Sequence, residues 1–267
     1  MSAGLGARGR PLITISGDTM HVARRFGVLT LLALTALEPA SAQRLARRAA
    51  GTGLTWGAGG FSNMQNAITS AFGGAANIFA VADISSLAAL STSTALYLDL
   101  GALSNGAMTA AEQATLTQYI ASGRRVFFLG ENDSWAPWNG SFLSVVGGAA
   151  GPNLTGSPPM TPIVANALTA GVTSVTTVGA GSATGGTQLF NQNVVQLRGA
   201  SNSVVSAFDY NMFSNAQWAN TSNAQFGQNV ATWLAAPTVV IPEPDTVALL
   251  AAGLAAVVVI ARRRRAR

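Results

Sequence analysis

The sequence has no cysteine, no lysine and a single histidine, His21. The absence of cysteine excludes a disulfide framework, a cysteine nucleophile and a zinc site with thiolate ligands. Because His21 lies in the N-terminal segment, the rest of the chain can build neither a Ser-His-Asp triad nor a histidine-ligated metal site. The sequence therefore predicts a body that is not an enzyme and that holds no metal and no cofactor.

Charged residues are also scarce, at 9% of the 267 residues, where an ordinary soluble domain has about 25%. Residues 43–236 carry six arginines and six acids, so the formal net charge of +5 comes from the two ends of the chain. Residues 1–42 have a net charge of +2, and residues 237–267 have a net charge of +3. Nucleic-acid binding depends on a basic surface, and a neutral body excludes it.

Residues 26–37 are an apolar run, with Arg24 and Arg25 before it and Ala40-Ser41-Ala42 after it. This order is typical of a secretory signal peptide, and it predicts that residues 1–42 are a signal region cleaved after Ala42. The run is too short to span a bilayer, which takes about 20 residues. A buried helix is the alternative. Residues 1–19 are unusual in front of a signal, so Met20 is an alternative start of the protein.

A second apolar run, residues 247–261, is followed at once by the cluster Arg262, Arg263, Arg264 and Arg265. We predict a transmembrane helix over residues 246–261. The apolar run spans about 22 Å at about 1.5 Å per residue, and arginine side chains that reach the interface extend it. Basic residues stay on the cytoplasmic side of a membrane, so this helix would place residues 43–236 outside the cytoplasm.

Pro242, Glu243 and Pro244 stand directly before this apolar run. Pro-Glu-Pro, a short apolar helix and an arginine cluster, in this order at the end of a chain, resemble the PEP-CTERM sorting signal of Gram-negative bacteria. The resemblance covers residues 241–267 of a tail that we place at 237–267. It implies that an exosortase, a membrane enzyme, recognises Pro-Glu-Pro, removes the tail, and releases the protein or attaches it to the cell surface. The alternative is a plain C-terminal anchor.

Residues 43–236 are enough for one extracytoplasmic domain with a sizeable core. After a short basic lead-in at residues 44–51, segments typical of strands alternate with segments typical of helices. We predict strands at residues 54–56, 77–81, 95–100 and 125–129, and β-rich pieces at 174–178, 193–197 and 203–208. We predict helices at residues 61–72, 84–90, 109–123, 141–146 and 224–234. This alternation predicts an α/β fold with a mainly parallel sheet flanked by helices on both faces.

Two of these segments carry specific signals. Thr109 and Glu112 form a capping box, in which two side chains satisfy backbone N–H groups at a helix start, and Gly123 ends the same helix. Residues 125–129 (Arg-Val-Phe-Phe-Leu) are almost continuously apolar. That pattern predicts a strand buried on both faces.

Residues 109–132, 166–172 and 229–234 resemble helix, turn and strand segments of class I glutamine-amidotransferase-like domains, which have a flavodoxin-like fold. The resemblance covers residues 54–235. Enzymes of that superfamily carry a nucleophilic cysteine after a central strand, served by a histidine. Here Gly130-Glu131-Asn132-Asp133 follows that strand, and residues 43–236 contain neither cysteine nor histidine. The resemblance therefore implies the fold without the amidase chemistry.

Open α/β sheets bind their ligands at the carboxyl ends of the strands. In the predicted sheet these ends carry four of the six acids of the body, and two asparagines: Asp99, Glu131, Asp133, Asp209, Asn132 and Asn211. Such oxygen atoms can hold Ca²⁺, or bind a sugar together with Trp135 and Trp138. The alternative is that they are turn and cap residues. For the glycine-rich residues 57–60, a tight turn is likewise the alternative to a phosphate site.

The sequence thus predicts an exported, exosortase-sorted protein of the cell surface or extracellular matrix, without enzymatic activity. The alternative is an extracytoplasmic carbohydrate-binding or acid-based hydrolytic domain that uses the strand-end carboxylates. The expected partners are an exosortase-type enzyme, the membrane through the C-terminal helix, and extracellular polysaccharide. After tail processing the protein would lie in the cell envelope, at the cell surface or outside the cell.

Overall fold

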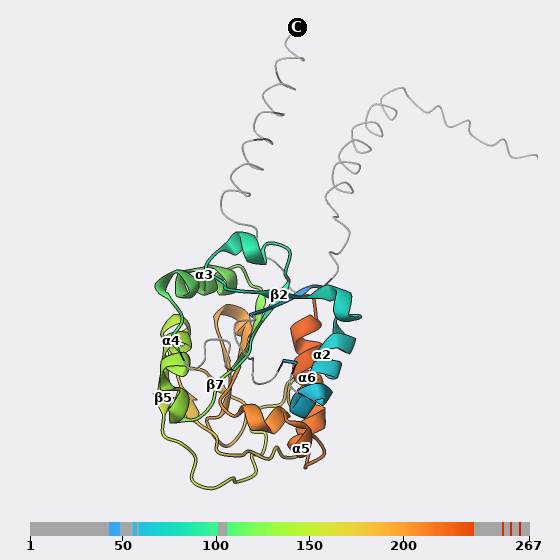
Figure 1. Ribbon diagram of the computed structural model, residues 1–267, viewed down its shortest axis with the longest axis vertical. Helices are drawn as coiled ribbons and strands as arrows, with labels where there is room; N and C mark the ends of the chain where they lie inside the picture. Colours follow the sequence, from blue (N-terminus) through green and yellow to red (C-terminus); the bar gives the residue numbers. More distant parts are fainter. Residues whose placement is uncertain are drawn as a thin grey trace, which may run out of the picture. The chain divides into compact units, whose positions relative to one another are not determined.

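The structure, a computed structural model, describes residues 43–48, 56–57, 59–100 and 106–237, together with Gly253, Val257 and Arg262 (Figure 1). The predicted signal region, its cleavage at Ala42 and the Pro-Glu-Pro motif lie outside these residues, as does most of the predicted helix at 246–261. Within the described part of the chain, no helix is both long and apolar enough to cross a membrane.

A seven-stranded sheet forms the centre of the domain. Its first five strands run parallel, and the last two are antiparallel to their neighbours. The order across the sheet is β2 (Ile78–Val81), β1 (Leu45–Arg48), β3 (Ala95–Leu98), β4 (Arg125–Leu129), β9 (Val204–Ala207), β8 (Val195–Arg198) and β7 (Thr187–Gln188). The predicted α/β class with a mainly parallel sheet is therefore confirmed.

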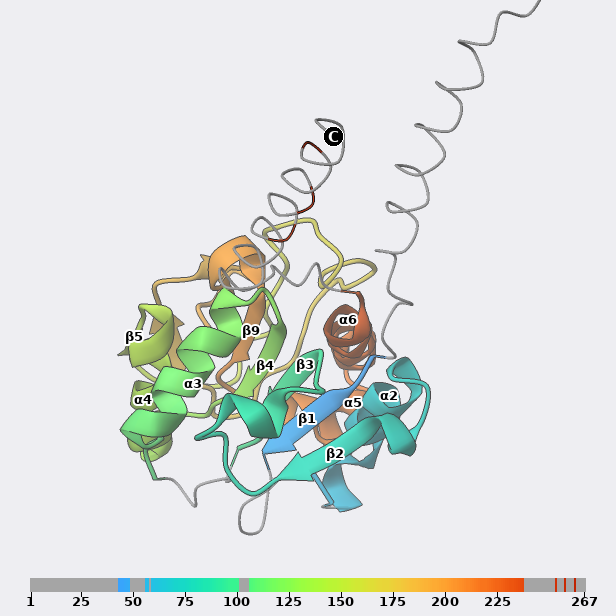
Figure 2. The same cartoon turned by 90° about the horizontal axis from the view of Figure 1, so that it is seen from above.

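Helices cover both faces of this sheet (Figure 2). On one face α2 (Ser62–Ala71) packs beside α6 (Asn223–Ala235), and on the other α3 (Ala110–Ala121) packs beside α4 (Ala136–Val146). The remaining elements in the described part of the chain are short: α5 (Asn215–Trp218), the antiparallel pair β5 (Ala149–Gly151) and β6 (Ser182–Thr184), and the 3₁₀ helices η1 (Gly59–Phe61), η2 (Ala75–Asn77), η3 (Leu87–Leu90), η4 (Asp133–Trp135), η5 (Ala200–Asn202) and η6 (Tyr210–Phe213).

The prediction of a basic lead-in at residues 44–51 is wrong, because residues 45–48 form β1 between β2 and β3. Leu45 and Ala46 are fully buried. The two arginines that made the segment look solvated have partners within the domain: Arg47 lies 5.3 Å from the ring centre of Trp56, and Arg48 is ion-paired with Glu112. Paired arginines allow a short strand to sit inside the sheet without burying a free charge.

Strand β4 is buried on both faces, as its sequence predicts. Phe127 stacks on Tyr97 at 5.4 Å and meets Phe213 edge-on at 5.6 Å on one side of the sheet. On the other side Phe128 stacks on Phe142 of α4 at 3.7 Å. Trp138 also lies on that side, where its indole N–H donates to the Leu129 carbonyl at 2.8 Å. Aromatic packing on both faces therefore fixes the central strand between the two helix layers.

The predicted helices at 61–72, 109–123 and 224–234 and the predicted strands at 77–81, 95–100, 193–197 and 203–208 correspond to elements of the structure. The capping box of α3 is present as well. The helix expected at residues 141–146 is longer, since α4 begins at Ala136 with a proline in its first turn. The helix expected at 84–90 is only the short η3.

The strand predicted at residues 174–178 is wrong, and the one predicted at 54–56 is described only at its last residue. Trp56 lies in a turn, and the other two residues of segment 54–56 are outside the described part. In segment 174–178 only Val175 forms an isolated bridge, with Met160. The Thr176 N–H donates instead to Asn223 Oδ1 at 2.8 Å, and the Val178 N–H to Asp209 Oδ2 at 2.6 Å. Side chains have taken the backbone bonds that a neighbouring strand would otherwise make.

Candidate functional site

Three acids from neighbouring strands gather at the carboxyl edge of the sheet. Asp99 follows β3, Glu131 follows β4, and Asp209 follows β9, and these strands are adjacent in the sheet. Their exposed fractions are 2%, 2% and 0%. The three acids stand at strand ends, where the sequence analysis expects them, but their side chains are buried in the protein rather than exposed to solvent.

Asp99 accepts a backbone hydrogen bond from the turn at Trp56 and Gly57. Its Oδ2 accepts the Trp56 N–H at 2.8 Å, and its Oδ1 accepts the Tyr97 hydroxyl at 3.3 Å. Burial raises the pKa of Asp99 to about 7, although these hydrogen bonds and the charge of Arg47 act in the opposite direction. The acid therefore serves as an acceptor for a loop and has little contact with solvent.

Glu131 joins two loops in the same manner. Its Oε1 accepts both the backbone and the side-chain N–H of Asn132 at 3.1 Å, and its Oε2 accepts the Tyr210 N–H at 3.1 Å. Burial, followed by the charge of Asp209, raises the pKa of Glu131 to about 8. This carboxylate ties the segment after β4 to the segment after β9.

Asp209 holds the segment in which a strand was wrongly predicted. Its Oδ2 accepts the Val178 N–H, and the nearby Asn211 amide donates to the Val178 carbonyl at 3.2 Å. Burial raises the pKa of Asp209 to about 7. Asn211 therefore acts with Asp209 in fixing the loop around Val178.

The remaining predicted site residues do not complete a ligand site. Asn132 caps η4 by accepting the Ser134 N–H at 3.0 Å, Asp133 is exposed, and Trp135 is half-buried. Trp138 cannot act as a sugar platform, since only 1% of it is exposed. The interpretation of the strand-end residues as turn and cap residues fits these contacts.

The space in front of Glu131 is small. The cavity there has a volume of about 40 Å³ and is lined by Glu131, Asn132, Asp133, Ala136, Asn139, Ala150, Gly151, Asn153, Gly181 and Ser182. This space holds about one water molecule and no sugar ring. In the described residues no three acid or histidine side chains come together in an arrangement that could hold a metal ion.

Asn139 supports this edge and was not found from the sequence. Its Oδ1 accepts the Glu131 N–H at 3.3 Å, and its amide donates to the Glu131 carbonyl at 2.6 Å. The side chain is 3% exposed. The sequence could indicate that Asn139 faces the interior, because it follows the buried Trp138, but only if the helix is known to begin at Ala136.

Gly57 lies in a turn with φ of +86°. This left-handed conformation agrees with the tight-turn interpretation of residues 57–60.

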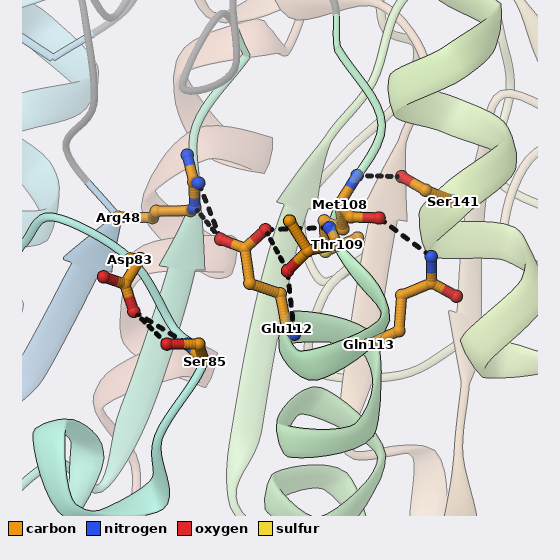
Figure 3. A network of polar contacts seen from close by, with 8 residues as sticks. All are labelled: Arg48, Asp83, Ser85, Met108, Thr109, Glu112, Gln113 and Ser141. Carbon is orange, nitrogen blue, oxygen red and sulfur yellow. Dashed lines mark hydrogen bonds and ion pairs between the residues drawn. The ribbon is translucent and has the colours of Figure 1, made fainter.

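A buried ion pair lies nearby, on the α3 side of the sheet (Figure 3). Arg48 donates from Nε at 2.9 Å and from Nη2 at 2.6 Å to Glu112 Oε1. Glu112 Oε2 accepts the Thr109 N–H at 2.9 Å. Burial raises the pKa of Glu112, but the bonds from Thr109 and Arg48 outweigh it and leave that pKa below its usual value. The sequence predicted the capping box but not its connection to β1.

Gly181 allows the loop before β6 to lie against the turn after β4. A Cβ at this position would come within 2.6 Å of the Glu131 carbonyl oxygen and 3.0 Å of the Asn132 Cα. Both are backbone atoms, which cannot turn aside as a side chain can. Gly181 is therefore a packing requirement of the carboxyl edge.

We expect Gly181→Ala to lower the free energy of unfolding by about 1–3 kcal/mol because of this overlap. The matched control is Gly140→Ala. Gly140 lies within α4 with no atom near its Cβ position, so alanine there is expected to stabilise the protein by up to about 1 kcal/mol. Urea titration of both variants measures the two effects. Equal shifts of the same sign would contradict the prediction.

A groove lies at the opposite, amino-terminal edge of the sheet. It has a volume of about 620 Å³ and is lined by residues including Arg125, Leu168, Ser203 and Trp233. Open α/β sheets bind their ligands at the carboxyl ends of the strands, so the sequence predicts no site residue at this edge. Arg125 and Ser203 were therefore missed, and only the folded chain brings them together.

Residues 240–265 match the PEP-CTERM protein-sorting motif. The match includes Pro242, Glu243 and Pro244 and the arginine cluster at 262–265. It supports the prediction that the chain is an exosortase substrate, and it implies export toward the cell envelope or surface. The PEP-CTERM motif leaves the activity of residues 43–236 open.

No curated protein sequence matches the chain. In fold it is similar to the mmIFT52 N-terminal domain, with a TM-score of 0.56 and 14% identity over 72% of this chain and 98% of that domain. A β-galactosidase from Rahnella sp. R3 matches with a TM-score of 0.49 and 14% identity, over 84% of this chain and 36% of the enzyme. A ThuA-like protein from Bacteroides uniformis ATCC 8492 matches with a TM-score of 0.43 and 13% identity, over 74% of this chain and 93% of that protein.

The first of these similarities shows a shared fold, and the other two are too low to carry an argument. The glutamine-amidotransferase-like resemblance is not confirmed by them and stays a prediction.

Proposed function

We propose that the protein is a non-catalytic domain that an exosortase-type enzyme delivers to the cell surface or the extracellular matrix. The observation that carries the proposal is the PEP-CTERM motif at residues 240–265. The apolar run at 26–37 supports it from the other end of the chain, because a signal peptide cleaved after Ala42 would start the export that the motif requires.

The tail, in this proposal, spans the membrane through residues 246–261 until it is cut. Arg262, Arg263, Arg264 and Arg265 then hold its end in the cytoplasm and keep Pro-Glu-Pro on the outer side. Cleavage beside the motif separates the domain from the membrane helix. The tail is thus a temporary attachment, whereas a plain anchor would remain in the mature protein.

The chemistry of the body supports a non-catalytic role. Residues 43–236 have neither histidine nor cysteine, and three of the strand-end carboxylates are buried and accept hydrogen bonds from loops. The alternative, an acid-based hydrolytic or carbohydrate-binding domain built on Asp99, Glu131, Asp133 and Asp209, would need these groups to reach a ligand. The cavity of about 40 Å³ beside Glu131 and Asp133 is too small for a sugar ring.

We expect the mature protein to end near Pro242, Glu243 and Pro244. Glu243→Ala should abolish this cleavage and leave the whole chain in the membrane fraction, because the motif is what the sorting enzyme recognises. Mass spectrometry of the C-terminus in the native organism measures both outcomes. The control Asp245→Ala removes an acid next to Pro-Glu-Pro and should be processed normally. A wild-type chain in the membrane fraction that still ends at Arg267 would contradict the proposal.

A further inference from the structure

The groove at the amino-terminal edge of the sheet contains the chemistry of a binding site. Arg125 is the first residue of β4, Ser203 directly precedes β9, and the Val126 N–H donates to the Ser203 carbonyl at 2.9 Å, which keeps the two side by side. The volume of about 620 Å³ lies within the range of pockets that hold small molecules.

Two polar groups of residues that line this groove have no hydrogen-bond partner among the described residues. They are Nη1 of Arg125 and Oγ of Ser203, a residue that is 6% exposed. Both atoms are buried just beneath the groove, so the two side chains must turn toward it to meet a ligand. Buried donors are almost always satisfied in folded proteins, and leaving one unsatisfied costs about 1–3 kcal/mol. The described lining residues include no aspartate or glutamate. An acceptor with negative charge is therefore what the groove lacks.

Trp233 of α6 holds the arginine in place. The guanidinium carbon lies 4.9 Å from the centre of its ring, so one flat face of the guanidinium is covered. Stacking leaves the N–H groups at the edge of the guanidinium for other partners. A planar fork of N–H donors matches the two oxygens of a carboxylate.

We propose that this groove binds a small hydroxylated carboxylic acid, such as a uronic acid, whose carboxylate accepts hydrogen bonds from Arg125 and Ser203. This inference adds a ligand class to the proposed function. It rests on the proposed function in one respect, namely that the groove binds a ligand and does not catalyse a reaction.

The residues that line the groove match both the carboxylate and the remaining atoms of such a ligand. A single guanidinium balances the charge of one carboxylate, whereas a phosphate monoester carries about −1.5 to −2. The amides of Asn166 and Asn202 line the same groove and can bond to hydroxyl groups, and Leu168 and Leu197 offer apolar surface to the carbon skeleton.

Calorimetric titration of the purified full chain in detergent with D-glucuronate tests the proposal, with D-glucose as the uncharged probe. We expect glucuronate to bind and glucose to bind about tenfold more weakly or not at all, since the carboxylate supplies the charge-assisted bonds. Equal binding of the two sugars, or binding of neither, would overturn the inference.

Variants locate the site. Arg125→Met should weaken glucuronate binding about tenfold or more. The control is Arg124→Met, which removes the same charge one residue earlier, where Arg124 lies 5.2 Å from the ring centre of Tyr119. It should leave the affinity unchanged, and an equal loss would overturn the proposal. Ser203→Ala is nearly isosteric, so it tests the groove should Arg125→Met fail to fold, and it should also weaken binding.

A further variant separates a free ligand from an internal one, because the tail carries Glu243 and Asp245. Neutralising both in one chain, with Glu243→Gln and Asp245→Asn, should leave the affinity for glucuronate unchanged. Tighter binding would show that the tail supplies the carboxylate and would overturn the proposal of a free acid. Binding is measured independently of tail processing, so loss of glucuronate binding with normal cleavage contradicts this inference alone.

Discussion

Glu112→Ala is expected to lower the free energy of unfolding by about 3–5 kcal/mol, the largest effect of any single substitution considered for this domain. Arg48 is 4% exposed, and Glu112 accepts two of its N–H groups. Removing the carboxylate leaves a positive charge buried in the sheet. The same change removes the acceptor of the Thr109 N–H at the start of α3, so a helix cap is lost together with the ion pair.

Urea and thermal unfolding of the full chain measure this loss. Glu112→Gln retains the shape and one acceptor oxygen, so it is expected to fall between wild type and Glu112→Ala. The matched control is Asp83→Ala. Asp83 is a neighbouring acid whose exposed side chain accepts only from Ser85 in the contacts drawn (Figure 3), and its removal should leave the unfolding midpoint nearly unchanged. Similar losses in Asp83→Ala and Glu112→Ala would contradict the assignment.

Stability is expected to decrease as the pH rises from about 5 to about 9, by several kcal/mol in total. Burial raises the pKa of Asp99 and Asp209 to about 7 and of Glu131 to about 8. In the unfolded chain the pKa values are about 3.9 for aspartate and about 4.3 for glutamate. Between these two sets of values the folded state binds more protons, so raising the pH favours unfolding.

The opposite sign applies to Glu112, whose pKa is lowered in the folded state. Its contribution is present above its unfolded pKa of about 4.3 and is lost below it. The two effects together place the stability maximum at mildly acidic pH. Thermal melts from pH 4 to pH 9 test the direction. Glu131→Gln should reduce the slope, because it removes one of the three buried groups whose pKa is raised. Melting temperatures that rise from pH 5 to pH 9 would contradict the prediction.

Local sequence signals predicted the elements whose backbone partners are close in the chain. The capping box at Thr109 and Glu112 lies within four residues, and the aromatic run of β4 is apolar whichever layer covers it. The failures came where distant side chains intervene. Segment 174–178 has β-branched residues, but Asp209 and Asn223 take its N–H groups. Arg47 and Arg48 made β1 resemble a solvated lead-in because their partners Trp56 and Glu112 lie outside the segment, and Glu112 is 64 residues from Arg48.

The sequence by itself determined two things about this protein: the α/β alternation, and the sorting tail with its motif at Pro242, Glu243 and Pro244. A linear motif is recognised by another protein, so the order of its residues is sufficient. Only the tertiary structure decided how the acids of the body are used. Asp99, Glu131 and Asp209 stand at strand ends, as predicted, but burial depends on which loops cover them, and those loops come from other parts of the chain. The groove could not be predicted from the sequence for the same reason, because its residues come from distant segments. Arg125 lies in β4, Ser203 precedes β9, and Trp233 lies in α6.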